Sequence, residues 1–306
     1  MKTKPTNNIV WKVSQDTTLL PFISESLVDQ NKTKVKQTLK YGSILVNGKV
    51  TTKHSHPLKK GDQVECISVK AAHHKQLEAR LLFPIIFEDN DLIVVEKPHG
   101  LLTMGTDKER EKTLYFHLTA YERAKSDRGK GRVFIVHRLD RETSGLVVFA
   151  KSEAIKNALQ KNWAQATKKY HAVTEGVPEE KQGTINTHLR EDKSKRVHSS
   201  KDHASGDSRP ATTHYCVIKS NATNALLEIM LKTGRKNQIR VHLSDLGHPI
   251  IGDNKYGAET NALQRLALHA SFLSLPHPTT DKMLTLRSTY PKGFNTMTRS
   301  TPKTKK

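Results

Sequence analysis

The sequence predicts an α+β protein with two domains. Short apolar runs of strand length recur along the chain and alternate with a few helical patterns. A basic segment over residues 17–70 carries its own turn signals, and a polar linker separates it from a longer, strand-rich segment over residues 82–290. The 306 residues suit one large domain with a small one, or two modest ones.

The charge balance indicates a polyanionic partner. Lys and Arg outnumber Asp and Glu by 51 to 30, a formal net charge of +21. An excess of this size favours nucleic acid over the alternative that the charge serves solubility alone. No apolar run reaches the length of a signal peptide or a membrane span, so we expect a cytoplasmic protein without a membrane partner. We also expect a monomer.

Cysteine and histidine spacing gives no sign of a metal site. Cys66 and Cys216 lie far apart, which fits two reduced thiols. The pair His73-His74 in the linker has no further ligands at a suitable spacing. We therefore expect no metal.

In the small domain, residues 34–41 have the pattern of a short helix. Val35 and Leu39 share one face, and Lys32, Lys36 and Lys40 share another. These lysines form either a solvated face or a phosphate-binding face, and their alignment favours the second. Gly42 follows at a position where helices often stop. Residues 1–16 are expected to be a loose lead-in.

A hairpin and a closing strand complete the small domain. Asn47-Gly48 between two apolar runs predicts a tight hairpin turn. Residues 19–23 (LLPFI), 34–53 (KVKQTLKYGSILVNGKVTTK) and 59–65 (KKGDQVE) together resemble the S4 RNA-binding domain. The family often has an arginine just before the first helix's lysines, where this chain reads Asn31-Lys-Thr-Lys34. Point charges therefore replace a planar fork there.

The large domain reads as strands with helices between them. Strands are expected over residues 82–87, 92–95, 132–136, 146–150, 170–176, 211–219 and 225–232. Helices are expected over 113–124, 152–164 with Ser152 as N-cap, and 236–246. Residues 191–209 are expected to form a charged loop, and the chain from about residue 291 a polar, mobile tail.

One polar turn stands out between two apolar strands. It reads His137-Arg-Leu-Asp-Arg-Glu-Thr-Ser-Gly145 and holds Asp140 among arginines. Loops on a scaffold often carry catalytic groups. An aspartate in a turn is nevertheless more often a turn former. The residues alone establish a carboxylate beside arginines and no more.

This turn resembles the signature of the pseudouridine synthases of the RluA type. Further stretches resemble the same family in the same order. They are residues 86–102, with Lys97-Pro-His-Gly100, and residues 168–172, 231–242, 247–253, 268–270 and 276–278. The resemblance covers residues 82–290. It implies a mixed, mostly antiparallel β-sheet with flanking helices, and an enzyme that requires no cofactor.

The resemblance also implies roles for single residues. Asp140 matches the catalytic aspartate, a nucleophile or base for breaking the bond between uracil and its sugar. Tyr170 matches the tyrosine that stacks on the target base. Arg240 matches the arginine that forms an ion pair with the aspartate and keeps it ionised.

Two positions of the turn are expected to contact substrate. Arg138 matches the residue that fills the gap left by the flipped nucleotide, and His137 precedes it. Asn237 stands where the family commonly has histidine. It can replace one hydrogen bond of a neutral histidine but not its proton chemistry, so we expect a structural position.

The resulting hypothesis is an RNA pseudouridine synthase, with ribosomal RNA as the favoured substrate and transfer RNA as the other. One alternative is an RNA-binding protein with an S4-like domain that has lost catalysis. The other is a glycosidase-like hydrolase, which would need a second acid. Glu142 is the nearest candidate in the sequence.

Overall fold

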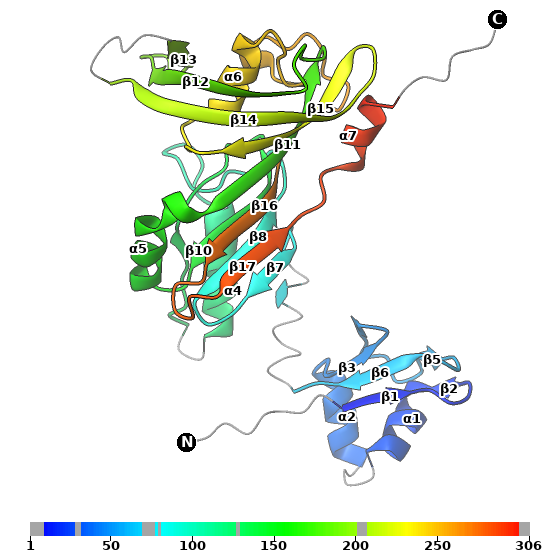
Figure 1. The fold of residues 1–306 in the computed structure, drawn as a ribbon. Coiled ribbons are helices and arrows are strands. Elements are labelled where there is room, and N and C mark those ends of the chain that lie inside the picture. Colours follow the sequence, from blue (N-terminus) through cyan, green and yellow to red (C-terminus); the bar gives the residue numbers. More distant parts are fainter. Residues whose placement is uncertain are drawn as a thin grey trace, which may run out of the picture. The chain divides into compact units, whose positions relative to one another are not determined.

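A computed structural model describes residues 9–27, 32–68, 77–78, 81–126, 129–200 and 207–299, apart from the side chains of Lys32 and Lys34. The chain divides into two compact units, residues 1–82 and 83–306 (Figure 1). His73-His74 in the linker lies outside the described residues. No helix in the described part of the chain is long and apolar enough to cross a membrane.

The N-terminal unit packs two helices against short strands. The helices are α1 (Leu19–Ser26) and α2 (Lys32–Lys40). The strands are β1 (Ile9–Lys12), β2 (Thr17–Thr18), β3 (Ile44–Val46), β4 (Lys49–Val50), β5 (Pro57–Leu58) and β6 (Gln63–Cys66). A four-stranded sheet has the order β1-β6-β3-β4, and β2 pairs with β5.

Local sequence signals explain this unit well. Val35 and Leu39 are buried in its core, as their spacing on one helix face predicts. Asn47 and Gly48 have φ angles of 48° and 77° and join β3 to β4 in the tight turn that the Asn-Gly pair predicts.

The expected loose lead-in over residues 1–16 is wrong for its second half. β1 pairs with β6 along its whole length, from Ile9 opposite Cys66 to Lys12 opposite Gln63. Val13, just after β1, is buried in the core. The unit therefore begins before residue 17, because β1 completes one edge of its sheet.

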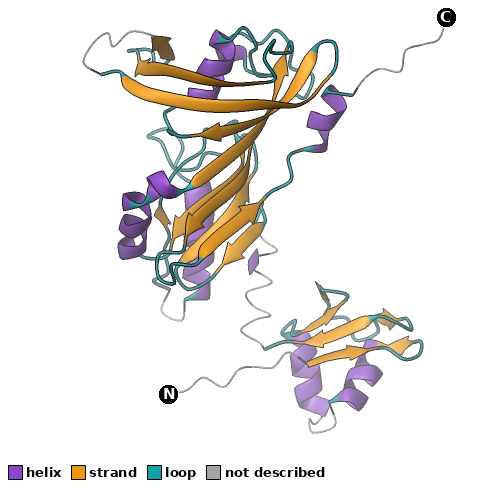
Figure 2. Cartoon of the chain, in the orientation of Figure 1, coloured by secondary structure: helices purple, strands orange, loops and turns teal. Residues whose placement is uncertain are grey.

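The C-terminal unit, residues 83–306, consists mainly of strands (Figure 2). They are β7 (Ile85–Glu88), β8 (Leu92–Lys97), β9 (Phe134–Ile135), β10 (Ser144–Ala150), β11 (Thr167–Glu175), β12 (Gln182–Glu191), β13 (Val197–Ser200), β14 (Arg209–Ser220), β15 (Asn224–Leu231), β16 (Leu268–Pro276) and β17 (Met283–Arg287). The helices are α4 (Leu114–Lys125), α5 (Glu153–Lys161), α6 (Gln238–Asp245) and α7 (Lys292–Met297), with 3₁₀ turns η1 (Trp163–Gln165) and η2 (Asn254–Tyr256).

These strands form one 11-stranded sheet within the described residues. Its order is β13-β12-β14-β15-β11-β16-β10-β8-β7, with β17 beside β16 and β9 beside β10. Every described strand pair is antiparallel except β10 with β16. The expectation of a mixed, mostly antiparallel sheet is thus confirmed.

The parallel contact requires a glycine directly after the polar turn. Gly145 lies opposite Ala270 with a φ of 115°. A Cβ at this position would stand 2.2 Å from the carbonyl oxygen of Ala270. Only glycine allows β10 to approach β16 this closely, and this approach fixes where the turn 137–143 leaves the sheet.

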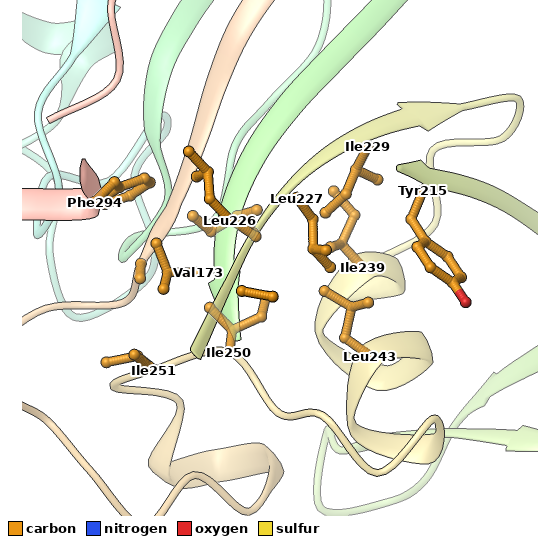
Figure 3. Close-up of a cluster of buried hydrophobic side chains, with 14 of the residues drawn as sticks. Val173, Tyr215, Leu226, Leu227, Ile229, Ile239, Leu243, Ile250, Ile251 and Phe294 are labelled. Atoms are coloured by element: carbon orange, nitrogen blue, oxygen red, sulfur yellow. The ribbon is translucent and has the colours of Figure 1, made fainter. Parts of the chain in front are cut away.

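Helix α6 lies on the sheet through an apolar face. Ile239 and Leu243 point toward Leu227 and Ile229 of β15 (Figure 3). The same cluster takes in Ile250 from the chain after the helix. Arg240, next to Ile239 in sequence, comes from this anchored helix.

Two expectations about irregular segments are wrong. Part of the expected loop 191–209 is β13, which pairs with β12 from Glu191 opposite Val197 to His188 opposite Ser200; residues 201–206 lie outside the described part. The expected tail begins with α7, whose Phe294 is fully buried and stacks on Tyr290. Met297 of the same helix also packs against the hydrophobic core that contains Phe294, so two apolar residues of a polar stretch anchor α7.

Candidate active site

The polar turn leaves the carboxylate of Asp140 free. Asp140 lies between β9 and β10 and is half-buried. Its backbone carbonyl accepts the N–H of Thr143 at 3.2 Å, which closes the turn. The carboxylate itself makes no hydrogen bond or ion pair with any described residue. A carboxylate without a partner is available to a substrate.

Contacts from residues 97–103 fix the backbone around Asp140. The hydroxyl of Thr103 donates to the Leu139 carbonyl at 2.8 Å and accepts the Leu139 N–H at 3.2 Å. The Gly100 N–H donates to the Arg141 carbonyl at 2.9 Å. The residues on both sides of Asp140 are therefore hydrogen-bonded to a second segment.

Lys97, the first residue of this second segment, connects it to the polar turn. Its side chain is fully buried, and its Nζ donates to the carbonyls of Pro98, Leu101 and Arg141 at 3.0, 2.7 and 2.9 Å. Burial lowers the pKa of Lys97 to about 7, against the opposing charges of Glu142 and Asp140. The Lys-Pro-His-Gly stretch thus joins two loops through one ammonium group.

A chain of hydrogen bonds continues behind the turn at Ser144. Arg265 Nη2 donates to Ser144 Oγ at 2.6 Å, and Ser144 Oγ lies 2.8 Å from His269 Nδ1. His269 Nε2 lies 2.9 Å from Ser288 Oγ, which donates to Glu96 at 2.7 Å. Because Arg265 only donates and the Ser288 hydroxyl donates to Glu96, the chain of donors runs from Arg265 to Glu96. Burial lowers the pKa of His269 to about 4, so this histidine is neutral near pH 7.

A pocket of about 220 Å³ opens beside Asp140. It is lined by Arg138, Leu139, Asp140, Thr143, Tyr170, Leu231, Gly234, Arg235, Lys236, Asn237, Gln238, Ile239, Arg240 and Leu268. The structure thereby brings together Asp140, Tyr170 and Arg240, three residues that are far apart in the sequence. Carboxylate, aromatic ring and guanidinium share one cavity.

A strand irregularity presents Tyr170 to this pocket. The register of β11 against β16 shifts between Lys169 and Tyr170, and such bulges re-aim side chains. Burial, together with the charge of Asp140, raises the pKa of Tyr170 well above its ordinary value. The phenol therefore stays protonated at neutral pH.

The ion pair expected between Arg240 and Asp140 is not the one observed. Arg240 donates from Nε to Asp253 Oδ2 and from Nη2 to Asp253 Oδ1, both at 2.7 Å. Asp253 is almost fully buried and must be paired to stay ionised. Burial lowers the pKa of Arg240, but the hydrogen bonds and charge of Asp253, and then the charge of Asp140, outweigh it and raise the pKa. Asp140 acts on Arg240 only through its charge.

Asn237 binds the remaining terminal nitrogen, Nη1, of the Arg240 guanidinium. Its Oδ1 accepts Arg240 Nη1 at 3.3 Å, and its Nδ2 donates to the Tyr256 hydroxyl at 3.0 Å. Its φ of 54° lies in the left-handed region, which asparagine tolerates better than most residues. These contacts support the expectation that this position is structural.

The two remaining residues of the turn have separate environments. Arg138 is exposed at the pocket and makes no ion pair with a described residue. His137 is not among the pocket's lining residues: its ring stacks on Trp163 at 4.6 Å, and its Nε2 accepts the Val148 N–H at 3.1 Å. Burial, and then Lys168, lowers the pKa of His137 to about 3. These contacts are those of a neutral structural histidine, so substrate binding by His137 is not supported.

The predicted lysine face belongs to the N-terminal unit. Lys36 and Lys40 are exposed on α2, opposite buried Val35 and Leu39. The side chain of Lys32 lies outside the described part.

Comparison with known proteins decides the family. A sequence model described as RNA pseudouridylate synthase matches residues 91–245. An uncharacterized RNA pseudouridine synthase of Bacillus subtilis, YhcT, is 32% identical over 94% of both chains. The chain belongs to the RNA pseudouridylate synthase family.

Other relatives agree with this assignment. The ribosomal large subunit pseudouridine synthase D of Escherichia coli is 31% identical over 84% of this synthase and 82% of its own length. The solved structure of human RNA pseudouridylate synthase domain containing 4 has a TM-score of 0.59 and 28% identity, covering 72% of this synthase and 92% of that chain. These relatives support the RluA type and an isomerase activity. The matched family range includes Asp140, Tyr170 and Arg240 but ends before Asp253.

Proposed function

We propose that Asp140 is the catalytic group with which this synthase converts uridine in RNA to pseudouridine. The observation that carries the proposal is the unpaired carboxylate of Asp140 in a pocket that also holds Tyr170 and Arg240. The reaction detaches uracil from its sugar, rotates it and rejoins it through C5. The carboxylate serves as nucleophile at C1′ or as base toward the neighbouring sugar carbon.

Tyr170 and Arg138 provide for base flipping. A uridine must leave its stack before Asp140 can reach the sugar, which costs a few kcal/mol. The Tyr170 ring offers a stacking surface inside the pocket, and the exposed Arg138 can fill the space that the nucleotide leaves.

Arg240 acts from a fixed position. A guanidinium has five N–H groups, and three of them are used by Asp253 and Asn237. The two others remain for Asp140, the uracil oxygens or a phosphate. Because Asp253 holds the fork, Arg240 supplies positive potential at Asp140 without needing Asp140 as its counter-ion.

The N-terminal unit is proposed to be an S4-like RNA-binding domain. The exposed side chains of Lys36 and Lys40 on α2 offer positive charge to phosphates. We propose ribosomal RNA as the substrate, with transfer RNA as the alternative. The similarity to the Escherichia coli large-subunit enzyme supports the first. A cytoplasmic monomer fits such a role.

Mapping pseudouridines in total RNA tests this function. Maps from cells with and without the gene are compared, and the gene is then restored with or without Asp140→Asn. We expect specific sites to disappear without the gene and to return only with Asp140. Unchanged maps contradict the function, and free uracil released by the purified protein would instead identify a hydrolase.

A further inference from the structure

The hairpin of β12 and β13 ends in a rigid, basic turn. Asp192 accepts the N–H of Arg196 through Oδ1 at 3.0 Å, and the Asp192 N–H donates to the Arg196 carbonyl at 2.8 Å. Lys195 takes a left-handed φ of 61° between them. The turn is thus held by its own hydrogen bonds, and the side chains of Lys195 and Arg196 remain exposed.

Tyr256 connects this hairpin to the active site. Its buried hydroxyl accepts the Val197 N–H at 3.2 Å and Asn237 Nδ2 at 3.0 Å. Asn237 in turn accepts from Arg240, which lines the pocket. One tyrosine therefore fixes both the hairpin and the loop that orients Arg240.

Lys255 and Lys236 also hold the hairpin turn, through the backbone carbonyl of Lys195. Lys255 Nζ donates to the Lys195 carbonyl at 3.0 Å, and Lys236 Nζ reaches the same oxygen at 3.4 Å. Lys236 also pairs with Glu191 and lines the pocket. The hairpin turn, Lys255 and the pocket wall are therefore adjacent.

Three cations surround the Tyr256 ring. Arg240, Arg196 and Lys255 lie 5.1, 5.3 and 5.7 Å from its centroid. Arg240 is already paired with Asp253. Arg196 and Lys255 are exposed and make no ion pair with any described residue. Two side-chain cations without an ion pair to a described residue thus lie beside one ring, and such charges favour a bound anion.

We propose that Arg196 and Lys255 bind a phosphate of the RNA strand next to the target uridine. This inference rests on the proposed function, because a uridine in the Asp140 pocket belongs to a strand that must continue past the pocket's rim. The Lys236 and Arg240 side of that rim leads to the hairpin. Phosphate bound there holds the strand in register while the base is flipped.

The test measures the salt dependence of binding by the full chain. All proteins carry Asp140→Asn, so that the probe, a single-stranded uridine decamer, is not turned over. Arg196→Gln combined with Lys255→Gln is compared with the unaltered pair by fluorescence anisotropy over a range of salt. Loss of two phosphate contacts reduces the slope of log K against log salt by about 1.4, which corresponds to roughly 25-fold weaker binding at about 0.1 M salt relative to 1 M.

Two further double variants serve as controls. Lys161→Gln with Lys219→Gln removes two exposed lysines of the same unit that have no contact with Tyr256, and should leave the slope nearly unchanged. Arg196→Lys with Lys255→Arg keeps both charges and should keep the slope. Equal slopes for the hairpin pair and the Lys161/Lys219 pair overturn the phosphate site. Turnover is measured separately in proteins that keep Asp140. If these proteins show no turnover, the proposed function is contradicted, whereas the phosphate site is not.

Discussion

Arg240 and Asp253 form a two-pronged ion pair, with Nε to Oδ2 and Nη2 to Oδ1 both at 2.7 Å. The carboxylate of Asp253 is fully buried and the Arg240 side chain is 12% exposed. The pair keeps the guanidinium at the pocket whether or not Asp140 is ionised. Asp253 therefore orients Arg240, and the Asp140 carboxylate is left for the catalytic role that we propose for it.

Replacing Asp253 should damage both stability and rate. Asp253→Asn leaves the buried guanidinium without its counter-ion, and breaking a buried pair costs about 3–5 kcal/mol. We expect a lower free energy of unfolding in urea and at least a tenfold slower single-turnover rate. Asp281→Asn, at an exposed left-handed position that asparagine also tolerates, is the matched control. An Asp253→Asn protein as active and stable as this control contradicts the role of the pair.

Lys97 should matter for rate more than for RNA affinity. Lys97→Met keeps the length of the side chain but removes the donor that joins the carbonyls of Pro98, Leu101 and Arg141. Loss of a buried charge partly offsets the unsatisfied carbonyls. A small displacement of a catalytic loop can cost about 100-fold in rate.

We therefore expect kcat for Lys97→Met to fall tenfold or more while Kd for RNA stays within about twofold. Lys161→Met, at an exposed lysine, controls for the substitution. Unchanged kcat in the Lys97 variant would show that the three hydrogen bonds of Lys97 do not position Asp140.

The C-terminal unit should lose stability in mild acid. Burial lowers the pKa of both His242 and His269 to about 4, against an unfolded value of about 6.5. Between these values the unfolded chain binds more protons than the folded one, so the free energy of unfolding falls as pH drops from 6.5 toward 4. At pH 5 each histidine should cost about 2 kcal/mol relative to neutral pH.

This dependence can be followed in a Trp11→Phe background. Trp163 then reports on the C-terminal unit alone. Since the His242 ring lies 2.8 Å from the hydroxyls of both Thr187 and Thr213, His242→Gln should lower stability at neutral pH but reduce the loss between pH 7 and pH 5. An equal loss in both proteins would exclude His242 as one source.

The N-terminal unit should supply affinity and not chemistry. Asp140, Tyr170 and Arg240 all lie in the unit that begins at Phe83. Removal of residues 1–76 should weaken binding to the natural RNA and flatten its salt dependence, while slow turnover of a short RNA at high concentration persists. A folded, truncated protein that binds the natural RNA undiminished would contradict this division of labour.

The sequence predicted what depends on local signals. The Asn47-Gly48 turn, the Ser152 N-cap of α5 and the buried face of α2 all follow from neighbouring residues. The placement of Asp140, Tyr170 and Arg240 around one pocket was expected from family resemblance alone, because it depends on how distant strands and α6 are arranged. β1 was missed because it is short and its pairing partner β6 is distant in the sequence. β13 was missed because its four residues lie in a polar, charged stretch with no apolar run of strand length.

The partner of Arg240 shows most clearly what the sequence alone does not predict. Asp253 ends the stretch 247–253, which resembles the family in sequence, yet nothing local distinguishes it from Asp140 as the counter-ion. Which carboxylate pairs with Arg240 depends on the path of the chain after α6. Ile250 is buried in the core, and the chain beyond it brings Asp253 within hydrogen-bonding distance of Arg240. Only the three-dimensional arrangement determines which carboxylate is paired and which is free.

The most direct test of the account is release of hydrogen from C5 of uridine by Asp140→Asn. Formation of the new bond to C5 displaces that hydrogen, so RNA labelled with tritium at C5 reports each turnover. The amide is close in shape to the carboxylate but is neither a nucleophile nor a base near neutral pH. Arg240 keeps Asp253 in this variant, so folding and RNA binding should stay near those of the unaltered protein. We predict tritium release at background level, and release above trace in a folded, RNA-binding Asp140→Asn protein would contradict Asp140 as the catalyst.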